Sequence, residues 1–361
     1  MGKKPYRVEL YYSKGKPYYH LVKDVRVKDQ RTKVRVYLGH EEPTAADVDN
    51  YRKEYAYTIE TKAAQKRAEF SSKLYTSKYL SKEDIITIET IRYYYKTFVS
   101  LLTTSEIDVY EQNFEVDYVQ GTTSIEGNTL NRQETRDLLI NNIPPNDKSL
   151  REINEVQNFK RVKAYRDAHR GKITLDFIKT LHSLIMSNID IESAGIFRRI
   201  DDVWIAGCEI RPTPAMLIVS ELTKLIDKYY SQLDKNIHPF EAAVMFHYEF
   251  EIIHPFTDGN GRVGREIFNY MLRKCGYPRL LFLGEERTTY IKSLKLGNIG
   301  KYAQMIKVFG DLITKQRYHI LMEKLKTVVL PAKKSTQLRL DAFYDRPVET
   351  KPIKMQENSA S

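Results

Sequence analysis

The stretch from His254 to Arg262, His-Pro-Phe-Thr-Asp-Gly-Asn-Gly-Arg, constrains the fold of this 361-residue chain more than any other. An imidazole ends one helical segment, a carboxylate and two glycines follow, and Arg262 and Arg265 open the next helical segment. Glycine lets backbone N–H groups turn toward one point, and a helix N-terminus adds the positive end of a dipole. The stretch therefore predicts a nest for an anion such as phosphate.

The side chains of the stretch suit chemistry on a bound phosphate. Arg262 and Arg265 share one helix face, so both can reach the same polyphosphate. Asp258 is a hard oxygen ligand of the kind that Mg²⁺ uses beside phosphate oxygens. Histidine has the side-chain pKa nearest neutral pH, which makes His254 the natural general base. The stretch thus contains the groups that nucleotidyl transfer requires.

A second interpretation of the same residues fails on its context. Gly259 to Gly264 also satisfies the GxGxxG pattern of dinucleotide-binding folds. That pattern is meaningful only after a strand in a βαβ unit, whereas residues 240–253 are helical in their periodicity. A dinucleotide-binding fold is therefore disfavoured.

The periodicity of the rest of the chain predicts a mainly α protein with a small N-terminal β-sheet. Residues 6–39 alternate apolar and polar positions, which indicates about three antiparallel strands. Thr44 is expected to cap a long exposed helix that begins at Ala45 and continues to about residue 75. Ser81 opens another helix. The remaining helical segments are expected at 105–125, 130–140, 149–169, 174–188, 215–233, 239–253, 262–275 and 288–326, with a β-hairpin between 195 and 214.

Four parts follow from this organisation. They are a β-rich segment at 1–42, a helical region at 43–148, a catalytic domain at 149–326 and a disordered basic tail at 327–361. The net charge of +11 favours anionic partners, among them nucleotides and nucleic acid. Two cysteines, no signal-peptide core and no apolar run of about 20 residues predict a cytoplasmic protein without membrane association.

The stretch at 254–262 matches the Fic family pattern HPFx(D/E)GN(G/K)R at every position, and Arg265 is the extra arginine of many members. The resemblance covers roughly residues 120–315 and implies a Fic helical core with a β-hairpin flap. His238-Pro-Phe-Glu-Ala-Ala resembles the helix before the family motif. Gly195-Ile-Phe-Arg and Ile205-Ala-Gly-Cys-Glu-Ile-Arg-Pro-Thr-Pro resemble the flap.

The resemblance implies a protein adenylyltransferase. His254 would deprotonate a Ser, Thr or Tyr hydroxyl of a protein target, and the oxygen would attack the α-phosphate of ATP. Asp258 would hold Mg²⁺ on the phosphates. The remaining roles implied by the family are phosphate binding by Gly259, Asn260, Gly261, Arg262 and Arg265, base contacts by Tyr290 and Asn298, and positioning of the target by Val203, Trp204, Ile205 and Ala206 in the flap.

A second motif predicts autoinhibition. Thr122-Thr-Ser-Ile-Glu126-Gly127 matches the family's inhibitory pattern (S/T)xxxE(G/N), which lies N-terminal to the core in one branch. Glu126 would pair with Arg265 and take the arginine that should hold the γ-phosphate. In some relatives the same glutamate supports removal of AMP.

Several alternatives stay open at this stage. The same site could remove AMP or transfer another nucleotide such as UMP. A different class of function is a non-catalytic regulator that binds nucleic acid or a partner through the basic segment Arg26 to Arg35. Self-modification and homodimer formation, which is common in related proteins, are further properties to consider for this chain.

Overall fold

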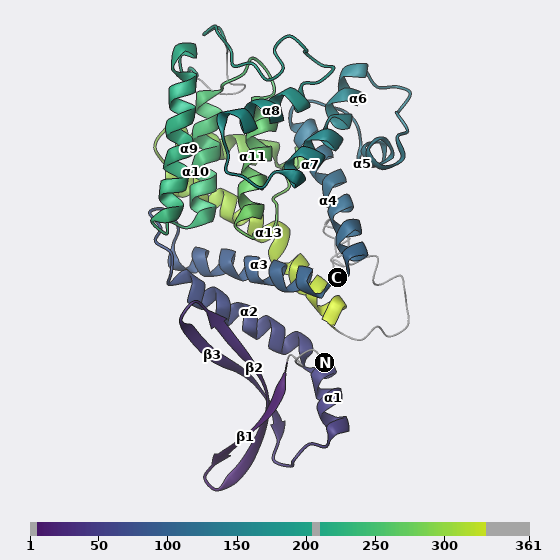
Figure 1. The fold of residues 1–361 in the computed structure, drawn as a ribbon, viewed down its shortest axis with the longest axis vertical. Coiled ribbons are helices and arrows are strands. Elements are labelled where there is room, and N and C mark those ends of the chain that lie inside the picture. Colours follow the sequence, from purple (N-terminus) through teal and green to yellow (C-terminus); the bar gives the residue numbers. More distant parts are fainter. Residues whose placement is uncertain (1–5, 204–209, 330–361) are drawn as a thin grey trace, which may run out of the picture.

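The computed structural model describes residues 6–203 and 210–329. They form an elongated, mainly helical body with one small sheet at its far end (Figure 1). The strands are β1 (Arg7–Ser13), β2 (Lys16–Val27) and β3 (Gln30–Gly39). The helices are α1 (Ala45–Glu54), α2 (Ala56–Ser72), α3 (Lys82–Leu101), α4 (Thr104–Ile125), α5 (Arg132–Arg136), α6 (Leu150–Gln157), α7 (Phe159–Ala168), α8 (Leu175–Ile185), α9 (Ile218–Asp234), α10 (Pro239–Ile253), α11 (Asn260–Lys274), α12 (Arg287–Asn298) and α13 (Tyr302–Val329).

The sheet is an antiparallel meander in the order β1-β2-β3, as the alternation predicts. Lys14 and Gly15, both with positive φ, form the two-residue turn between β1 and β2, which suits the right-handed twist of a hairpin. One face of the sheet buries Leu21, Val25, Val34 and Val36 against α2. That burial holds the sheet on the helical body, because an isolated small sheet is marginally stable in water.

Helix α1 is capped by Thr44 and α3 by Ser81, as expected, each through a capping box with an aspartate three residues later. The prediction of one long exposed helix from Ala45 to about residue 75 is wrong. The helix breaks at Tyr55, and α2 lies between the sheet and α3 (Figure 1), where its Ile59 is fully buried. The alanines of α2 do not indicate burial in the sequence, but their small side chains let the sheet and α3 pack closely on two sides of this helix.

Two other predicted helices are also broken. The segment 149–169 consists of α6 and α7, which meet at Asn158, where the side chain donates to Ile185 O at 2.9 Å and fixes the bend. The segment 288–326 consists of α12 and α13, separated by a turn in which Gly300 has φ +74°. Helix α13 continues to Val329, beyond the predicted start of the tail at residue 327, and residues 330–361 lie outside the described part.

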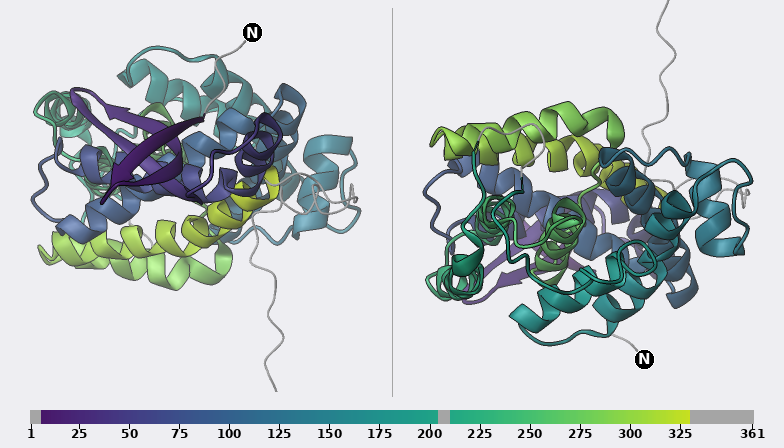
Figure 2. Two further views of the ribbon diagram at one scale, coloured as in Figure 1. Left: turned by 90° about the horizontal axis from the view of Figure 1, so that it is seen from below. Right: turned by 90° about the horizontal axis from the view of Figure 1, so that it is seen from above.

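The helical body is built around α10 and α11, with α8 and α9 on one side and α3 and α13 near the sheet (Figure 2). A buried ion network ties α11 to the helices before it. Arg166 on α7 donates to Glu266 on α11 at 2.9 Å and to Glu115 on α4 at 3.1 Å. Burial alone raises the pKa of Glu115, but Arg166 and Arg279 outweigh it and hold that pKa at about 2. The network keeps α4 and α11 in fixed register.

We expect Arg166→Leu to lower the free energy of unfolding by about 3–5 kcal/mol, because the change leaves two buried carboxylates with a missing partner. Urea unfolding followed by circular dichroism measures it. Lys163→Ala, on the same helix but in a half-exposed pair with Asp167, should change stability by no more than about 1 kcal/mol. Equal effects of the two changes would contradict the buried network.

Candidate active site

The stretch at 254–262 forms a tight loop between α10 and α11. Helix α10 ends at His254, which takes the left-handed conformation with φ +48°, and Gly259, with φ +77°, caps the start of α11. Asn260 closes the loop, because its side chain accepts from Phe256 N at 2.9 Å and donates to Phe256 O at 2.8 Å. Phe256 itself is fully buried and stacks on His182. Local glycine geometry and these two bonds therefore fix the loop.

The ring of His254 is oriented by the end of its own helix. Its Nδ1 lies 3.2 Å from Glu251 O, and since a carbonyl only accepts, Nδ1 carries the hydrogen and Nε2 keeps a free lone pair. Burial, supported by the positive charge of Arg198, lowers the pKa of His254 to about 4. At neutral pH the ring is thus uncharged, which is the form that can accept a proton.

Arg265 and Glu126 are in direct contact. Arg265 Nη2 donates to Glu126 Oε1 at 2.6 Å, and Arg265 Nε donates to Thr122 Oγ1 at 2.8 Å. Burial alone raises the pKa of Glu126, but the charge of Arg265 outweighs it and lowers that pKa below its ordinary value. A Cβ on Gly261 would lie 2.6 Å from Glu126 Oε1, so a larger residue there would require this carboxylate to shift. The threonine and the glutamate of the predicted inhibitory motif therefore hold one arginine.

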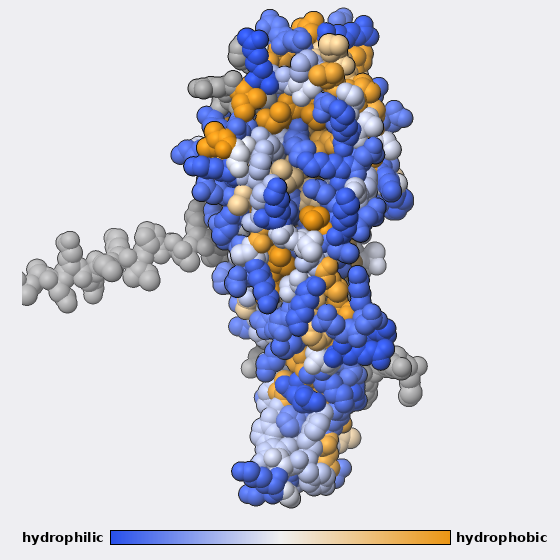
Figure 3. Space-filling view, turned by 90° about the vertical axis from the view of Figure 1, so that its left-hand side faces the viewer, coloured by the Kyte–Doolittle hydropathy of each residue, from blue (hydrophilic) through white to orange (hydrophobic). Residues whose placement is uncertain are grey.

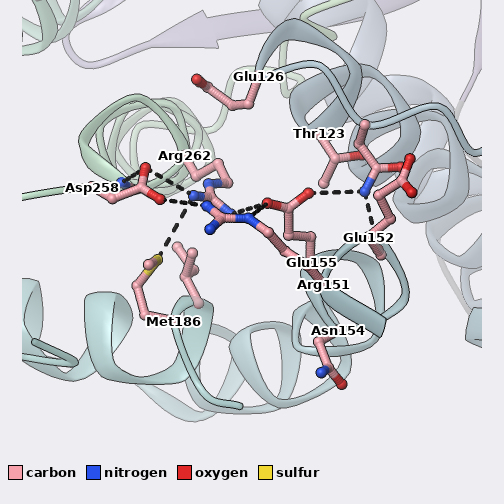
Figure 4. A network of polar contacts seen from close by, with 12 residues as sticks. Thr123, Glu126, Arg151, Glu152, Asn154, Glu155, Met186, Asp258 and Arg262 are labelled. Atoms are coloured by element: carbon pink, nitrogen blue, oxygen red, sulfur yellow. Dashed lines mark hydrogen bonds and ion pairs between the residues drawn. The ribbon is translucent and has the colours of Figure 1, made fainter. Parts of the chain in front are cut away.

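Asp258 is neutralised from two sides (Figure 4). Its Oδ1 accepts from Arg262 Nη2 at 3.2 Å and from Gly259 N at 2.6 Å, while its Oδ2 accepts from Arg151 Nη2 at 2.7 Å. Arg262 is buried and also donates to Glu155 on α6 at 3.3 Å. Burial alone raises the pKa of Asp258, but the arginine charges prevail and lower it. The carboxylate is therefore ionised at neutral pH.

One cleft brings six of the predicted site residues together, whereas Asp258, Gly259, Asn260 and Arg262 are not part of its lining. Glu126, His254, Gly261, Arg265, Tyr290 and Asn298 all line the same cavity of about 110 Å³. Apolar side chains such as Ile291 and Leu294 complete its wall. Tyr290 is buried and its hydroxyl lies 2.9 Å from His247 Nε2, whereas Asn298 accepts from Tyr248 at 3.3 Å. A pocket with an apolar wall and a few convergent polar groups is the usual form of a ligand site.

The two arms of the expected flap are anchored beside this cleft. Arg198 N donates to Pro255 O at 2.9 Å, and Thr213 N donates to Ile252 O at 3.2 Å. Val203 is half-buried, and no strand is assigned to 196–203 or 210–214 among the described residues. Trp204, Ile205 and Ala206 lie outside the described residues, so the hairpin and its contacts with a target stay a prediction.

Four residues of the site have no role in the sequence-based prediction. Arg151 and Glu155 reach the motif from α6, and Arg198 donates from Nε to His254 O at 2.9 Å. Glu251 lines the cleft, where burial raises the pKa of its carboxyl to about 7. Arg198 was detectable, since it ends the flap-like Gly195-Ile-Phe-Arg. The other three look like ordinary charges on amphipathic helices.

Comparison with known proteins places the site in a family. The Fic/DOC family model matches residues 172–272. The proteins named protein adenylyltransferase Fic from Drosophila willistoni and Drosophila melanogaster are each 31% identical to this chain, over 201 and 202 residues respectively. Each match covers 55% of this chain and 40% of the relative, so the chain spans less than half the length of these relatives.

Solved structures share the fold. A Fic-1 fragment from C. elegans aligns with a TM-score of 0.59 at 22% identity, covering 78% of this chain and 86% of that one. A Fic-domain-containing signaling protein from Bacteroides thetaiotaomicron aligns with a TM-score of 0.56 at 22% identity, covering 66% of this chain and 96% of that one. The intact motif loop at 254–262 lies near the C-terminal end of the matched residues, so residues 172–272 of this chain carry a Fic/DOC domain.

Proposed function

We propose that this protein is an adenylyltransferase that moves AMP from ATP to a Ser, Thr or Tyr hydroxyl of a protein. The observation that carries the proposal is the cleft that His254, in its neutral form, lines together with Gly261 and Arg265. The name of the curated relatives, protein adenylyltransferase, supports the same activity. A binding module would need neither a free imidazole Nε2 nor an ionised Asp258 beside an arginine-rich helix N-terminus.

The chemistry follows from the placement of these groups. His254 Nε2 takes the proton of the target hydroxyl, the oxygen attacks the α-phosphorus of ATP, and the bond to pyrophosphate breaks. The N-terminus of α11, with Gly259, Asn260 and Gly261, offers backbone N–H groups to the phosphates. Arg262 and Arg265 add positive charge where negative charge develops. Positioning and charge stabilisation therefore supply most of the rate, as in phosphoryl transfer generally.

The residues present fit a magnesium ion held jointly with the nucleotide. Among the residues that the structure describes, no three His, Cys, Asp or Glu side chains cluster as a metal site. Mg²⁺ is commonly bound by one or two carboxylates plus substrate phosphates, and Asp258 provides one such carboxylate. When bound, the ion would neutralise phosphate charge.

Arg151 would compete with a metal ion for the carboxylate of Asp258. Its side chain is 58% exposed and contacts Asp258 Oδ2, whereas Arg262 is buried and fixed on Oδ1. We expect Arg151→Ala to lower the metal concentration needed for half-saturation about fivefold, since an exposed pair is worth up to about 1 kcal/mol. Manganese binding in the presence of ADP, followed by electron paramagnetic resonance, measures it. Lys163→Ala is the control for lost charge, and an unchanged or higher metal requirement in Arg151→Ala refutes the competition.

Glu126 restrains the activity in this proposal. Its contact with Arg265 places a negative charge where the γ-phosphate belongs, so ATP would bind with its α-phosphate out of line. The motif is contiguous with Asn128, whose side chain donates to Glu155 Oε2 at 2.9 Å. Glu155 also holds Arg262, so the inhibitory turn and the phosphate-binding helix share one carboxylate.

The direct test is the intact mass of the Glu126→Gly protein after incubation with magnesium and either ATP or UTP. A gain of one AMP supports the proposal and also reveals self-modification. A gain of one UMP supports the alternative donor. Loss of AMP from a previously labelled target identifies the reverse reaction. No mass change on the protein or on any added protein substrate, with nucleotide bound, favours the non-catalytic regulator.

The division of the chain belongs to this proposal. Residues 149–326 would form the catalytic domain, and residues 43–148 would present Glu126 to it. None of the helices in the described part combines the length and apolarity that crossing a membrane requires.

A further inference from the structure

The N-terminal sheet has one face that the helical body does not use for its core. The buried face consists of Leu21, Val25, Val34 and Val36, which pack on α2. Side chains alternate between the two faces of a strand. The opposite face therefore carries the residues in the other register, in which Tyr11 pairs with Tyr18 and His20 pairs with Tyr37.

The outward face carries a continuous group of aromatic rings. Ring centroids lie 5.3 Å apart for Tyr11 and His20, 5.5 Å for His20 and Tyr37, and 5.8 Å for Tyr18 and Tyr37. His40 joins them at 4.5 Å from Tyr18. We call this group the aromatic platform; Tyr37 is 47% exposed and His40 is exposed, whereas Tyr11, Tyr18 and His20 are half-buried. Unpaired nucleic-acid bases stack on such rings with little regard to sequence.

The same sheet concentrates positive charge. Residues 6–40 contain nine Lys and Arg residues against three Asp and Glu residues, so a net +6 of the chain's +11 lies in this short segment. The surface at this end of the molecule is mainly blue and pale in the space-filling view (Figure 3). Arg35 lies over the ring of Tyr11 at 4.8 Å, next to the platform. A phosphate backbone is the natural counter-charge for such a surface.

One pair of arginines indicates an anionic ligand, and this observation is independent of the aromatic platform and of the net charge of the segment. Arg26 and Arg31 stand directly opposite each other in the β2–β3 register, and both are exposed. Like charges in this relation destabilise a sheet. Arg26 contacts the carbonyl of Lys28 at 3.0 Å, which leaves the repulsion between the two guanidinium groups in place. A phosphate between them would relieve it.

We propose that this face binds single-stranded nucleic acid, with bases stacked on the aromatic platform and phosphates on Arg26, Arg31 and Arg35. The sides of a duplex do not fit the platform, since bases within a duplex are already stacked on one another. The site lies at the opposite end of the molecule from the motif loop (Figure 1). It is therefore separate from the nucleotide cleft and would localise the enzyme on a polynucleotide.

Fluorescence anisotropy of the full chain with labelled 12-nucleotide single strands of RNA and DNA, and with the matched duplex, tests the proposal. We expect single strands to bind and the duplex to bind at least tenfold more weakly. Three phosphate contacts, one for each arginine, would reduce affinity about 20-fold between 50 and 200 mM NaCl. Tyr37→Ala should weaken binding at least fivefold, while Tyr37→Phe should not.

Arg31→Ala should weaken binding and reduce the salt dependence without loss of thermal stability, because it also removes the like-charge pair. Lys224→Ala, an exposed lysine on α9, controls for net charge and should bind as wild type. Absence of binding at 50 mM NaCl overturns the proposal. Equal affinity for the duplex, or wild-type affinity in both Tyr37→Ala and Arg31→Ala, also overturns it. These readouts do not depend on AMP transfer.

Discussion

Replacing Glu126 by glycine should raise AMP incorporation at least about tenfold over wild type. The reason is the 2.6 Å contact with Arg265, a charge-assisted bond of the kind worth about 1.5–3 kcal/mol. Removing the carboxylate releases Arg265 for the γ-phosphate and removes a negative charge from the cleft. Incorporation from radiolabelled ATP into the protein itself and into a cell extract measures the change.

Graded variants separate charge from shape. Glu126→Gln keeps the size of the side chain and an acceptor oxygen but loses the charge, so its activity should lie between wild type and Glu126→Gly. Asp108→Ala removes an exposed acidic residue from the same helix and should leave labelling unchanged. Equal labelling by wild type and Glu126→Gly would refute the inhibitory role of Glu126.

The contact also has a pH dependence. The pKa of Glu126 is lowered in the folded protein, because the charge of Arg265 outweighs the effect of burial. The ion pair is therefore fully formed above the ordinary glutamate pKa of about 4.3, and it is lost as pH falls through the lowered value. Inhibition should thus stay constant across the neutral range. Inhibition that weakens between pH 8 and pH 6 would have to come from a group other than Glu126.

Replacing His254 by alanine should reduce AMP transfer at least about 100-fold in the Glu126→Gly background, the usual scale for loss of a general base. Only Nε2 of this ring is free to take a proton, because Nδ1 donates to Glu251 O at 3.2 Å. Binding of ATP should change little, since the phosphates rest on α11. Intact mass and calorimetric titration with ATP measure the two quantities separately.

A matched control is His319→Ala, which removes an exposed imidazole from α13 and should transfer AMP as its parent does. The acid limb of the rate profile carries a further expectation. Burial lowers the pKa of His254 to about 4, so the ring stays neutral well below pH 6.5 until bound phosphates raise that value. Transfer that persists in His254→Ala would exclude this ring as the base.

The sequence alone determined the features that depend on neighbours along the chain. The loop from His254 to Arg262 needs only a left-handed Gly259, the Asn260–Phe256 bonds and the start of a helix, all within nine residues. The three strands follow from strict alternation, and the helix starts at Ala45 and Lys82 follow from local capping boxes. These features depend only on residues close together in the chain and not on tertiary contacts, which is why the sequence alone predicts them.

Only the tertiary structure decided which distant charges complete the site. Arg151 and Glu155 lie more than a hundred residues before Asp258 and Arg262, and their contacts form because the fold brings side chains of α6 within reach of the motif loop and the start of α11. A charged residue on an amphipathic helix has the same sequence pattern in solvent or in a cleft. The breaks at Tyr55 and Asn158 could not be predicted from the sequence either, because no proline or glycine marks them. The first accompanies the packing of α2 on two sides, and the second the buried side-chain hydrogen bond of Asn158.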